Sequence, residues 1–245
     1  MQLSRRFAVL TTGQGFSKRV FLQDKAGQKQ SPWHHLDLPT GLIVPGVIEI
    51  SRHQIAKYEV SLKEPFNPIK QDTRKNKRTG VEELRFYGQF PLFNYGCIPQ
   101  TWENSLENDP KYPYKGDGDP LDIVEIGEAP LATGSVADVK VIGALCLVDS
   151  GEADWKVICV NTQDSHADQL NCPEDVDRLY PGKLAAIRHW FEVIKTFDGK
   201  PRNRFEGASE GPAEALALIA HCHKQWQRVK TGEFPSLGYW LGGNN

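Results

Sequence analysis

Short segments in which apolar and polar residues alternate fill the first two thirds of the chain. They lie at residues 18–23, 46–52, 56–62, 83–88, 121–127, 135–149 and 154–161. A period of two is typical of strands with one buried face. It places Lys57 and Glu59 on the same side of their strand, and it places Ile48 and Ile50 on the side opposite Glu49. Several short strands at such close spacing predict a β-barrel or a β-sandwich.

The last third of the chain has a helical pattern instead. Residues 180–200 and 211–230 each have a proline near their start, followed by apolar residues at spacings of three and four. This spacing gives a helix one apolar face, and proline is favoured in the first turn. We therefore expect two helices packed on the barrel. No internal repeat and no clear linker occurs, so we expect a single domain over residues 1–245. The apolar stripe of the first helix is Leu184, Ile187, Phe191 and Ile194.

Composition and charge exclude several classes of protein. The 245 residues are 39% hydrophobic and 24% charged, as in ordinary globular proteins, and the net charge of −2 argues against broad nucleic-acid binding. The longest apolar run, residues 141–148, is far shorter than the roughly 20 residues that a membrane helix needs. Five cysteines without a CxxC pair indicate a reducing compartment. We expect the cytoplasm. Because the first 23 residues contain four basic residues and no acid, a mitochondrion or plastid is the alternative.

An unusual cluster of acids stands in the stretch KGDGDPLDIVEIG, residues 115–127. Asp117, Asp119 and Asp122 fall within six residues, and their mutual repulsion is costly unless a cation is present. A calcium-binding EF-hand does not fit, because Asp122 stands where the sharp turn of that loop needs glycine. Taken alone, the cluster leaves a solvated acidic loop as an alternative.

A second pair of acids strengthens the case for a metal. The stretch CLVDSGEADWKVICV reads as two strands joined by residues 150–153, so Asp149 and Asp154 would flank the loop and face each other. Like charges placed across a strand pair destabilise it. Lys156 is two residues beyond Asp154 and shares its side of the strand. A metal ion bound by the carboxylates would account for this arrangement.

Together these acids predict the chemistry. Carboxylate oxygens in this number suit Mg²⁺, which binds through carboxylates and through the phosphates of a substrate. Basic residues beside such a site suit a highly anionic substrate. The pattern therefore predicts metal-assisted hydrolysis of a phosphoanhydride. The candidate acids are Glu49, Glu59, Asp117, Asp119, Asp122, Asp149 and Asp154, and the candidate bases are Lys57, Arg85, Lys156 and Lys195.

These segments resemble those of a known family. The signature D-x-D-P-x-D followed by an apolar strand stands here as DGDPLD, and the segments IEISRHQIAKYE, NYGCIPQTWE, DWKVICV and FDGKPRNRF follow the order of the family. The chain resembles the family I soluble inorganic pyrophosphatases, most closely their eukaryotic branch. The resemblance covers roughly residues 12 to 230.

The resemblance implies a fold, a reaction and residue roles. The fold would be α+β but mainly β: an OB-like five-stranded barrel with flanking helices. The reaction would be hydrolysis of pyrophosphate to two orthophosphates in a multi-Mg²⁺ carboxylate site, where metal-activated hydroxide attacks phosphorus in line. Asp119 would be the general base, and Glu49 would orient waters. The implied metal ligands are Glu59, Asp117, Asp122, Asp149 and Asp154, and the implied phosphate ligands are Lys57, Arg85, Tyr95, Lys156 and Lys195.

One position departs from the family pattern. The family has a tyrosine before the lysine of the segment FEVIKTFDGK, and its hydroxyl contacts phosphate, whereas this chain has Ile194. A lost hydrogen bond to a charged oxygen costs roughly 1.5–3 kcal/mol, so we expect weaker substrate binding or slower turnover. Ile194→Tyr should then raise kcat/KM, unless another group already fills that role.

Three alternatives stay open. The chain could be a non-catalytic relative that serves as a scaffold, although every implied catalytic acid is present. It could also act on nucleotides or polyphosphate. Eukaryotic relatives are often dimers, so a homodimer is allowed, but the segment SRHQ differs from their aromatic-containing dimer contact.

Overall fold

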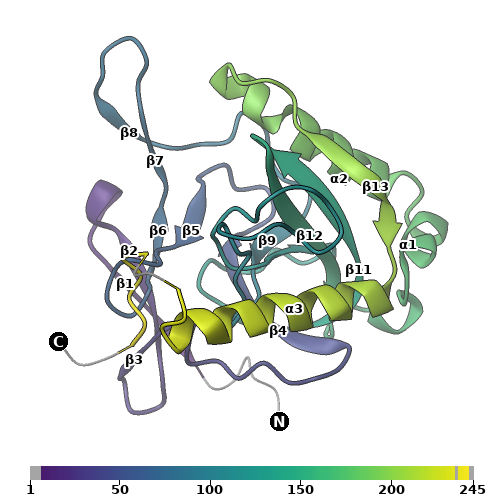
Figure 1. Cartoon of the computed structure of the whole chain (residues 1–245), viewed down its shortest axis with the longest axis horizontal. Helices are drawn as coiled ribbons and strands as arrows, with labels where there is room; N and C mark the ends of the chain where they lie inside the picture. Colours follow the sequence, from purple (N-terminus) through teal and green to yellow (C-terminus); the bar gives the residue numbers. More distant parts are fainter. Residues whose placement is uncertain (1–6, 235–236, 243–245) are drawn as a thin grey trace.

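A closed ring of five strands forms the centre of the computed structural model, which describes residues 7–234 and 237–242 (Figure 1). The strands pair in the order β12-β10-β9-β4-β11, and β11 pairs with β12 to close the ring. The predicted five-stranded, mainly β barrel with helices outside is confirmed. The ring consists of β4 (Ile43–Ile50), β9 (Asn94–Cys97), β10 (Asp122–Glu125), β11 (Val136–Asp149) and β12 (Glu152–Asn161), with β13 (Arg204–Glu210) added at the edge of β11.

A second sheet and a hairpin lie beside the barrel. The sheet pairs in the order β1-β2-β6-β5, with β3 on β2. The hairpin extends away from the barrel and forms the arm at the top left of Figure 1. The sheet strands are β1 (Ala8–Thr12), β2 (Arg19–Gln23), β3 (Lys29–Gln30), β5 (Tyr58–Val60) and β6 (Ile69–Gln71), and the hairpin strands are β7 (Thr73–Lys75) and β8 (Glu82–Leu84).

Both predicted helices are present. They are α2 (Lys183–Val193), which continues into the 3₁₀ turn η4 (Ile194–Asp198), and α3 (Pro212–Lys230), which starts at its proline. A further short helix, α1 (Pro173–Leu179), was not expected from the sequence. Two other 3₁₀ turns are η2 (Gly15–Ser17) and η3 (Ala167–Gln169).

Apolar side chains fill the inside of the barrel and touch across it. A Cβ atom on Gly46 of β4 would lie 2.5 Å from Cδ1 of Ile123 on β10, a strand that does not pair with β4. The buried side chains inside the barrel form one hydrophobic cluster. Ala215 and Ile219 of α3, which crosses the front of the barrel in Figure 1, pack in the same cluster. The outer face of the same wall packs against α2 in a separate cluster. The barrel wall is therefore buried on both faces, as its near-continuous apolar runs require.

The strand β12 shows how one wall serves both a core and a polar site. Trp155 and Val157 join the cluster inside the barrel, whereas Asp154 and Lys156 point to the opposite face. Successive side chains of a strand alternate between its faces, so a single strand supplies both.

The simple alternation predicted around Glu49 is wrong. The pairing of β4 with β9 shifts between Ile48 and Ile50, which marks a β-bulge at Glu49. Ile48 consequently packs inside the barrel, while Ile50 packs in a third cluster with the second sheet. The extra residue turns the Glu49 carboxylate to the wall of the cavity described below.

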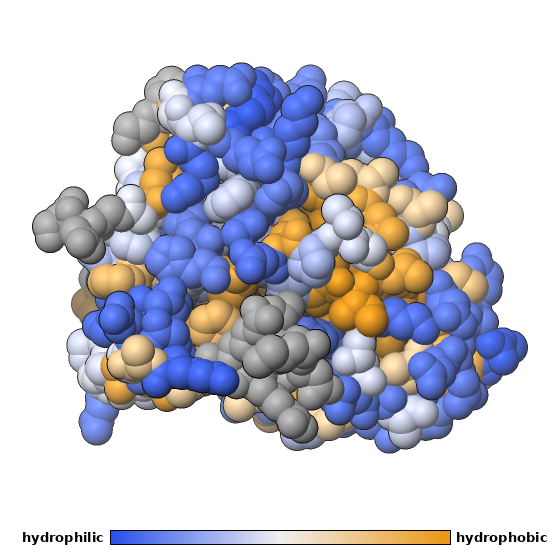
Figure 2. Space-filling model, turned by 90° about the horizontal axis from the view of Figure 1, so that it is seen from below, coloured by the Kyte–Doolittle hydropathy of each residue, from blue (hydrophilic) through white to orange (hydrophobic). Residues whose placement is uncertain are grey.

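No described helix is long and apolar enough to cross a membrane. The face seen from below, in Figure 2, is mostly hydrophilic, with a larger apolar area right of centre and smaller apolar areas among the polar side chains elsewhere.

Candidate active site

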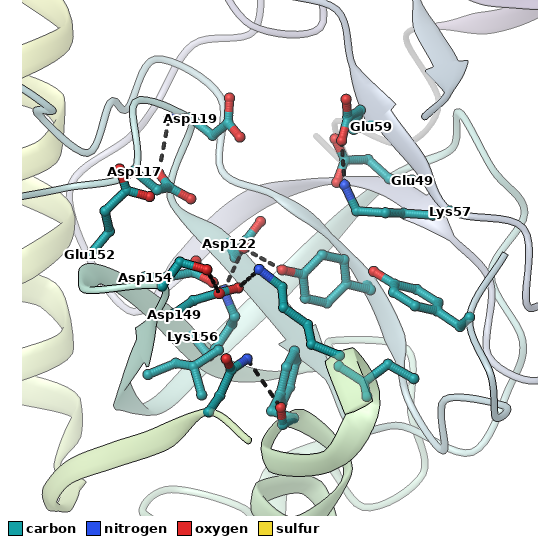
Figure 3. A pocket seen from close by; sticks show the side chains of 18 of the residues that line it. Glu49, Lys57, Glu59, Asp117, Asp119, Asp122, Asp149, Glu152, Asp154 and Lys156 are labelled. Carbon is teal, nitrogen blue, oxygen red and sulfur yellow. Dashed lines mark hydrogen bonds and ion pairs between the residues drawn. The ribbon is translucent and has the colours of Figure 1, made fainter. Parts of the chain in front are cut away.

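Every site residue expected from the sequence lines one cavity. Its volume is about 270 Å³, and it lies between the barrel wall and the end of α2. Figure 3 shows the labelled acids around a common space, with Asp117 and Asp119 on one side and Glu49 and Glu59 on the other. The cavity thus brings together residues from five separated parts of the chain. The expected residues on its wall are Glu49, Lys57, Glu59, Arg85, Tyr95, Asp117, Asp119, Asp122, Asp149, Asp154, Lys156 and Lys195.

Two glycines allow the acidic loop to take its shape. The loop lies against Glu103, whose backbone N–H donates to the Asp119 carbonyl over 2.9 Å and whose carbonyl accepts from Gly118 over 3.0 Å. A Cβ atom on Gly116 would stand 2.5 Å from the Glu103 carbonyl carbon, and Gly118 has a φ of 89°. Only glycine fits the first position, and glycine is strongly favoured at the second. The spacing of the aspartates is therefore tied to the glycines between them.

The hairpin of β11 and β12 differs from its prediction. Asp149 pairs with Glu152, and the loop is only Ser150 and Gly151, with φ values of 56° and 92°. Left-handed values at both positions are those of a type I′ turn, which matches the twist of the strands. Asp154 therefore pairs with Leu147 and does not face Asp149 directly. Both acids still line the cavity, because the pairs Asp149–Glu152 and Leu147–Asp154 are two residues apart on each strand.

A buried lysine neutralises part of the acidic cluster. Lys156 is 1% exposed, and its ammonium group donates to Asp122 over 2.7 Å and to Asp154. Asp122 stands opposite Lys156 in the parallel pair of β10 and β12, so the strand register itself sets the first contact. The Tyr95 hydroxyl donates to the same Asp122 oxygen.

A chain of ion pairs forms the opposite wall. Lys57 Nζ lies 2.5 Å from Glu59, which confirms that Lys57, just before β5, and Glu59, within it, have their side chains on the same side. The carboxylate of Asp72 accepts from both Lys57, over 3.0 Å, and Arg85, over 2.9 Å. Arg85 also pairs with Asp198 over 3.2 Å. Asp72 thus holds the side chains of Lys57 and Arg85 at the cavity. The sequence did not reveal this role, because Asp72 lies outside the segments that resemble the family.

The remaining predicted cation is held by an acid of the hairpin. Lys195, in η4, pairs with Asp149. Glu152, which the sequence reading passed over, lines the same cavity and stands opposite Asp149 in the hairpin. Its place on the strand face was hidden by the longer loop that the sequence led us to expect.

One group of oxygens is arranged as a metal site would be. Carboxylate oxygens of Glu103, Asp117 and Asp154 all lie within 4.8 Å of one another. The family resemblance implies that Asp117, Asp122 and Asp154 hold one ion together. The Asp122 carboxylate lines the same cavity and accepts hydrogen bonds from Tyr95 and Lys156. Glu103 Oε2 is buried without a hydrogen-bond partner among the described residues. The sequence signal for Glu103 was available, since it closes the segment NYGCIPQTWE.

Burial and mutual repulsion raise the pKa of the clustered acids. Burial, with repulsion from Glu59, raises the pKa of Asp119 to about 7 although the residue keeps solvent access. Burial raises the pKa of Asp122 to about 6 against the opposing effect of Lys156. The pKa of Asp117 is raised by burial and by Asp154, and that of Glu49 by burial and by Asp122. The wall carries eight carboxylic acids and four basic side chains, so the cavity is short of positive charge, which favours the binding of divalent cations.

Comparison with known proteins gives the family. The family model described as inorganic pyrophosphatase matches residues 46–227. The chain belongs to the inorganic pyrophosphatase family. It is 42% identical over 216 residues to "Soluble inorganic pyrophosphatase 6, chloroplastic" of Arabidopsis thaliana, covering 86% of this chain and 70% of that protein.

Solved inorganic pyrophosphatases share the fold. The structure from Schistosoma japonicum has a TM-score of 0.89 at 34% identity, and the match covers 96% of this chain and 85% of that one. The N-terminally truncated vacuolar soluble pyrophosphatase of Trypanosoma cruzi in complex with PPi has a TM-score of 0.84 at 34% identity, covering 94% and 92%. These matches confirm the resemblance and the enzyme class inferred from the sequence, an inorganic diphosphatase.

Proposed function

We propose that the cavity hydrolyses pyrophosphate to two orthophosphates with Mg²⁺ held by its carboxylates. The observation that carries this proposal is the meeting of the acids and the cations in one cavity of about 270 Å³. A relative of the same fold has been solved in complex with PPi. A small polyanion needs both the cations and the metals that such a cavity attracts.

The donor set fits Mg²⁺. All the ligands on offer are carboxylate oxygens, which this ion prefers. Glu103 Oε2 is buried without a partner among the described side chains, and it lies in the group with Asp117 and Asp154. A bound cation would satisfy this oxygen. Glu59, Asp122 and Asp149 line the same cavity and would hold further ions.

The residues of the chain have separable tasks in this reaction. When bound, Mg²⁺ lowers the pKa of coordinated water and neutralises charge on phosphate oxygens. Asp119 would take the proton from the attacking water, because it lines the cavity and keeps solvent access. Lys57 and Arg85 on one wall and Lys156 on the other would hold the phosphates. Each must exchange a carboxylate partner for a phosphate oxygen, or share it, when substrate enters.

A phosphate-release assay tests the function. Purified protein is mixed with pyrophosphate with and without Mg²⁺, and orthophosphate is measured. We expect release only with Mg²⁺ and in a ratio of two phosphates for each pyrophosphate consumed. Absence of phosphate release with Mg²⁺ would support a scaffold role. Faster release from ATP or tripolyphosphate would mean that the substrate is a nucleotide or a polyphosphate instead of pyrophosphate.

We also propose, as expected from the sequence, a single domain over residues 1–245, a cytoplasmic location with mitochondrion or plastid as the alternative, and a homodimer as an allowed assembly.

A further inference from the structure

Tyr87 is a cavity residue to which neither the sequence motifs nor the proposed reaction gives a task. It lies two residues beyond Arg85, in a segment that runs beside residues 55–57: Lys57 N–H donates to the Arg85 carbonyl over 3.1 Å, and Tyr87 N–H donates to the Ile55 carbonyl over 2.7 Å. The segment is extended, so Arg85 and Tyr87 share a side while Phe86 between them is 47% exposed. Both Arg85 and Tyr87 line the active-site cavity.

The ring of Tyr87 is held, but its hydroxyl is not. The ring meets Trp190 of α2 edge to face, with the ring centroids 5.0 Å apart. Trp190 is itself fixed, because its Nε1 donates to the Phe90 carbonyl over 3.1 Å. The Tyr87 hydroxyl makes no hydrogen bond to any residue that the structure describes. A half-buried phenol that is held by its ring and free at its oxygen is suited to meet a ligand.

The surroundings of this hydroxyl are those of a phosphate site. The charges of Lys57 and Arg85 act on it most strongly after burial, and those of Asp122 and Lys156 follow. Burial raises the pKa of Tyr87 to about 12, so the hydroxyl keeps its proton at neutral pH and can donate it in a hydrogen bond. A phosphate oxygen held between these cations would accept such a bond.

The position of Tyr87 also explains an apparent gap in the cavity. Ile194 lines the cavity and is 6% exposed, so it presents only methyl groups there. Ile194 follows Trp190 by one helical turn, and its N–H donates to the Trp190 carbonyl. Residues four apart lie on one face of a helix. The ring of Tyr87 therefore rests against the same helix face that carries Ile194.

We propose that the hydroxyl of Tyr87 donates a hydrogen bond to a phosphate of the substrate, at the wall where Ile194 offers no donor. The inference rests on the proposed function, because the substrate is the pyrophosphate assigned to this cavity. It changes the expectation from the sequence alone: with Tyr87 in place, Ile194→Tyr should improve the unaltered enzyme only slightly.

Tyr87→Phe removes the hydroxyl and keeps the ring against Trp190. We expect KM for pyrophosphate to rise between about tenfold and about 100-fold, as for loss of a hydrogen bond to a charged oxygen. The inhibition constant of methylenebisphosphonate, an analogue that is not hydrolysed, should rise with it, while the melting temperature stays the same. Tyr112→Phe is the matched control, since Tyr112 packs on Trp155 outside the cavity.

A double-mutant cycle with Ile194→Tyr completes the test. In the Tyr87→Phe background this substitution should restore most of the lost affinity, whereas in the unaltered chain it should add little. Unchanged KM and inhibition constants in Tyr87→Phe would overturn the inference while the parent enzyme still turned over pyrophosphate. Equal gains from Ile194→Tyr in both backgrounds would also overturn it. Failure of the proposed function itself would be distinct, because the parent enzyme would then release no phosphate.

Discussion

Removal of the buried ammonium group of Lys156 gives the sharpest test of the charge balance in the cavity. The side chain is 1% exposed and pairs with two carboxylates, Asp122 and Asp154. Its ammonium nitrogen lies 5.8 Å from the centroid of the Tyr95 ring and 5.5 Å from that of Phe191. Lys156→Met keeps an unbranched side chain of similar length in this space and removes the charge alone.

The expected loss of stability is large. Breaking a buried ion pair by removal of one partner costs about 3–5 kcal/mol, because the remaining charge is left uncompensated. Here two carboxylates lose their partner, with side chains only 16% and 12% exposed. Protonation of one of them would relieve part of the cost, so we expect about 3 kcal/mol without metal. That is a substantial part of the roughly 5–15 kcal/mol that stabilises a typical domain.

The assay is urea unfolding followed by circular dichroism, with and without saturating Mg²⁺. A divalent cation can replace the lost charge, so Mg²⁺ should stabilise Lys156→Met by more than it stabilises the parent chain. At a concentration of 100 times the dissociation constant, one bound ion alone contributes about 2.7 kcal/mol. Turnover should remain low in the variant, because the ammonium group that would donate hydrogen bonds to a phosphate is gone and a metal ion has no proton to donate.

Lys183→Met is the matched control. Lys183 donates to the Ile126 carbonyl over 2.6 Å and forms no ion pair with a described acid. The loss of unfolding free energy in Lys183→Met should be the same with and without Mg²⁺. If Lys156→Met were as stable as the parent chain without Mg²⁺, or if Mg²⁺ added equal stability to both, the cavity would not be short of positive charge and the reasoning would be wrong.

Three further predictions concern single groups. Asp119→Asn should lower kcat by orders of magnitude while calorimetry still detects Mg²⁺ binding, and near-normal turnover would refute its role as the base. Asp72→Asn removes the carboxylate shared by Lys57 and Arg85, so KM for pyrophosphate should rise about tenfold with little change in kcat; an unchanged KM would mean that the substrate orients both cations itself. Burial lowers the pKa of His34 to about 3, so the folded state excludes a proton that the unfolded chain binds below about pH 6.5. As the pH falls from 6 to 4, the unfolding free energy of the parent chain should therefore drop by about 1.4 kcal/mol per pH unit more than that of His34→Gln. Urea unfolding at several pH values measures both slopes, and equal slopes would contradict this prediction.

Alternation along the strands predicted much of the site, because a period of two fixes which side chains share a face. It gave the common side of Lys57 and Glu59 and the common face of Asp154 and Lys156. It failed where the backbone leaves the regular pattern. The bulge at Glu49 separates Ile48 from Ile50. A bulge depends on pairing with a distant strand, which the local sequence does not contain.

Long-range contacts account for the rest of what was missed. Arg85 pairs with Asp72 and Asp198, which are 13 and 113 residues away along the chain, and nothing in the sequence around Arg85 indicates either partner. Glu103 joins the acids only because the glycine loop lies against its backbone. Such partners are set by the closure of the barrel and have no periodic signature.

The two faces of β12 limit how this protein can change. An insertion of one residue after Asp154 would turn every later side chain of the strand to the opposite face. Lys156 would then point among the packed side chains of the barrel, and Trp155 would point into the active-site cavity. A substitution in this strand changes the contacts of one side chain. A change in its length would move the apolar core residues to the cavity face and the cavity residues into the core. We therefore expect natural length variation to collect in the outlying β7–β8 arm and to spare the strands that enclose the centre.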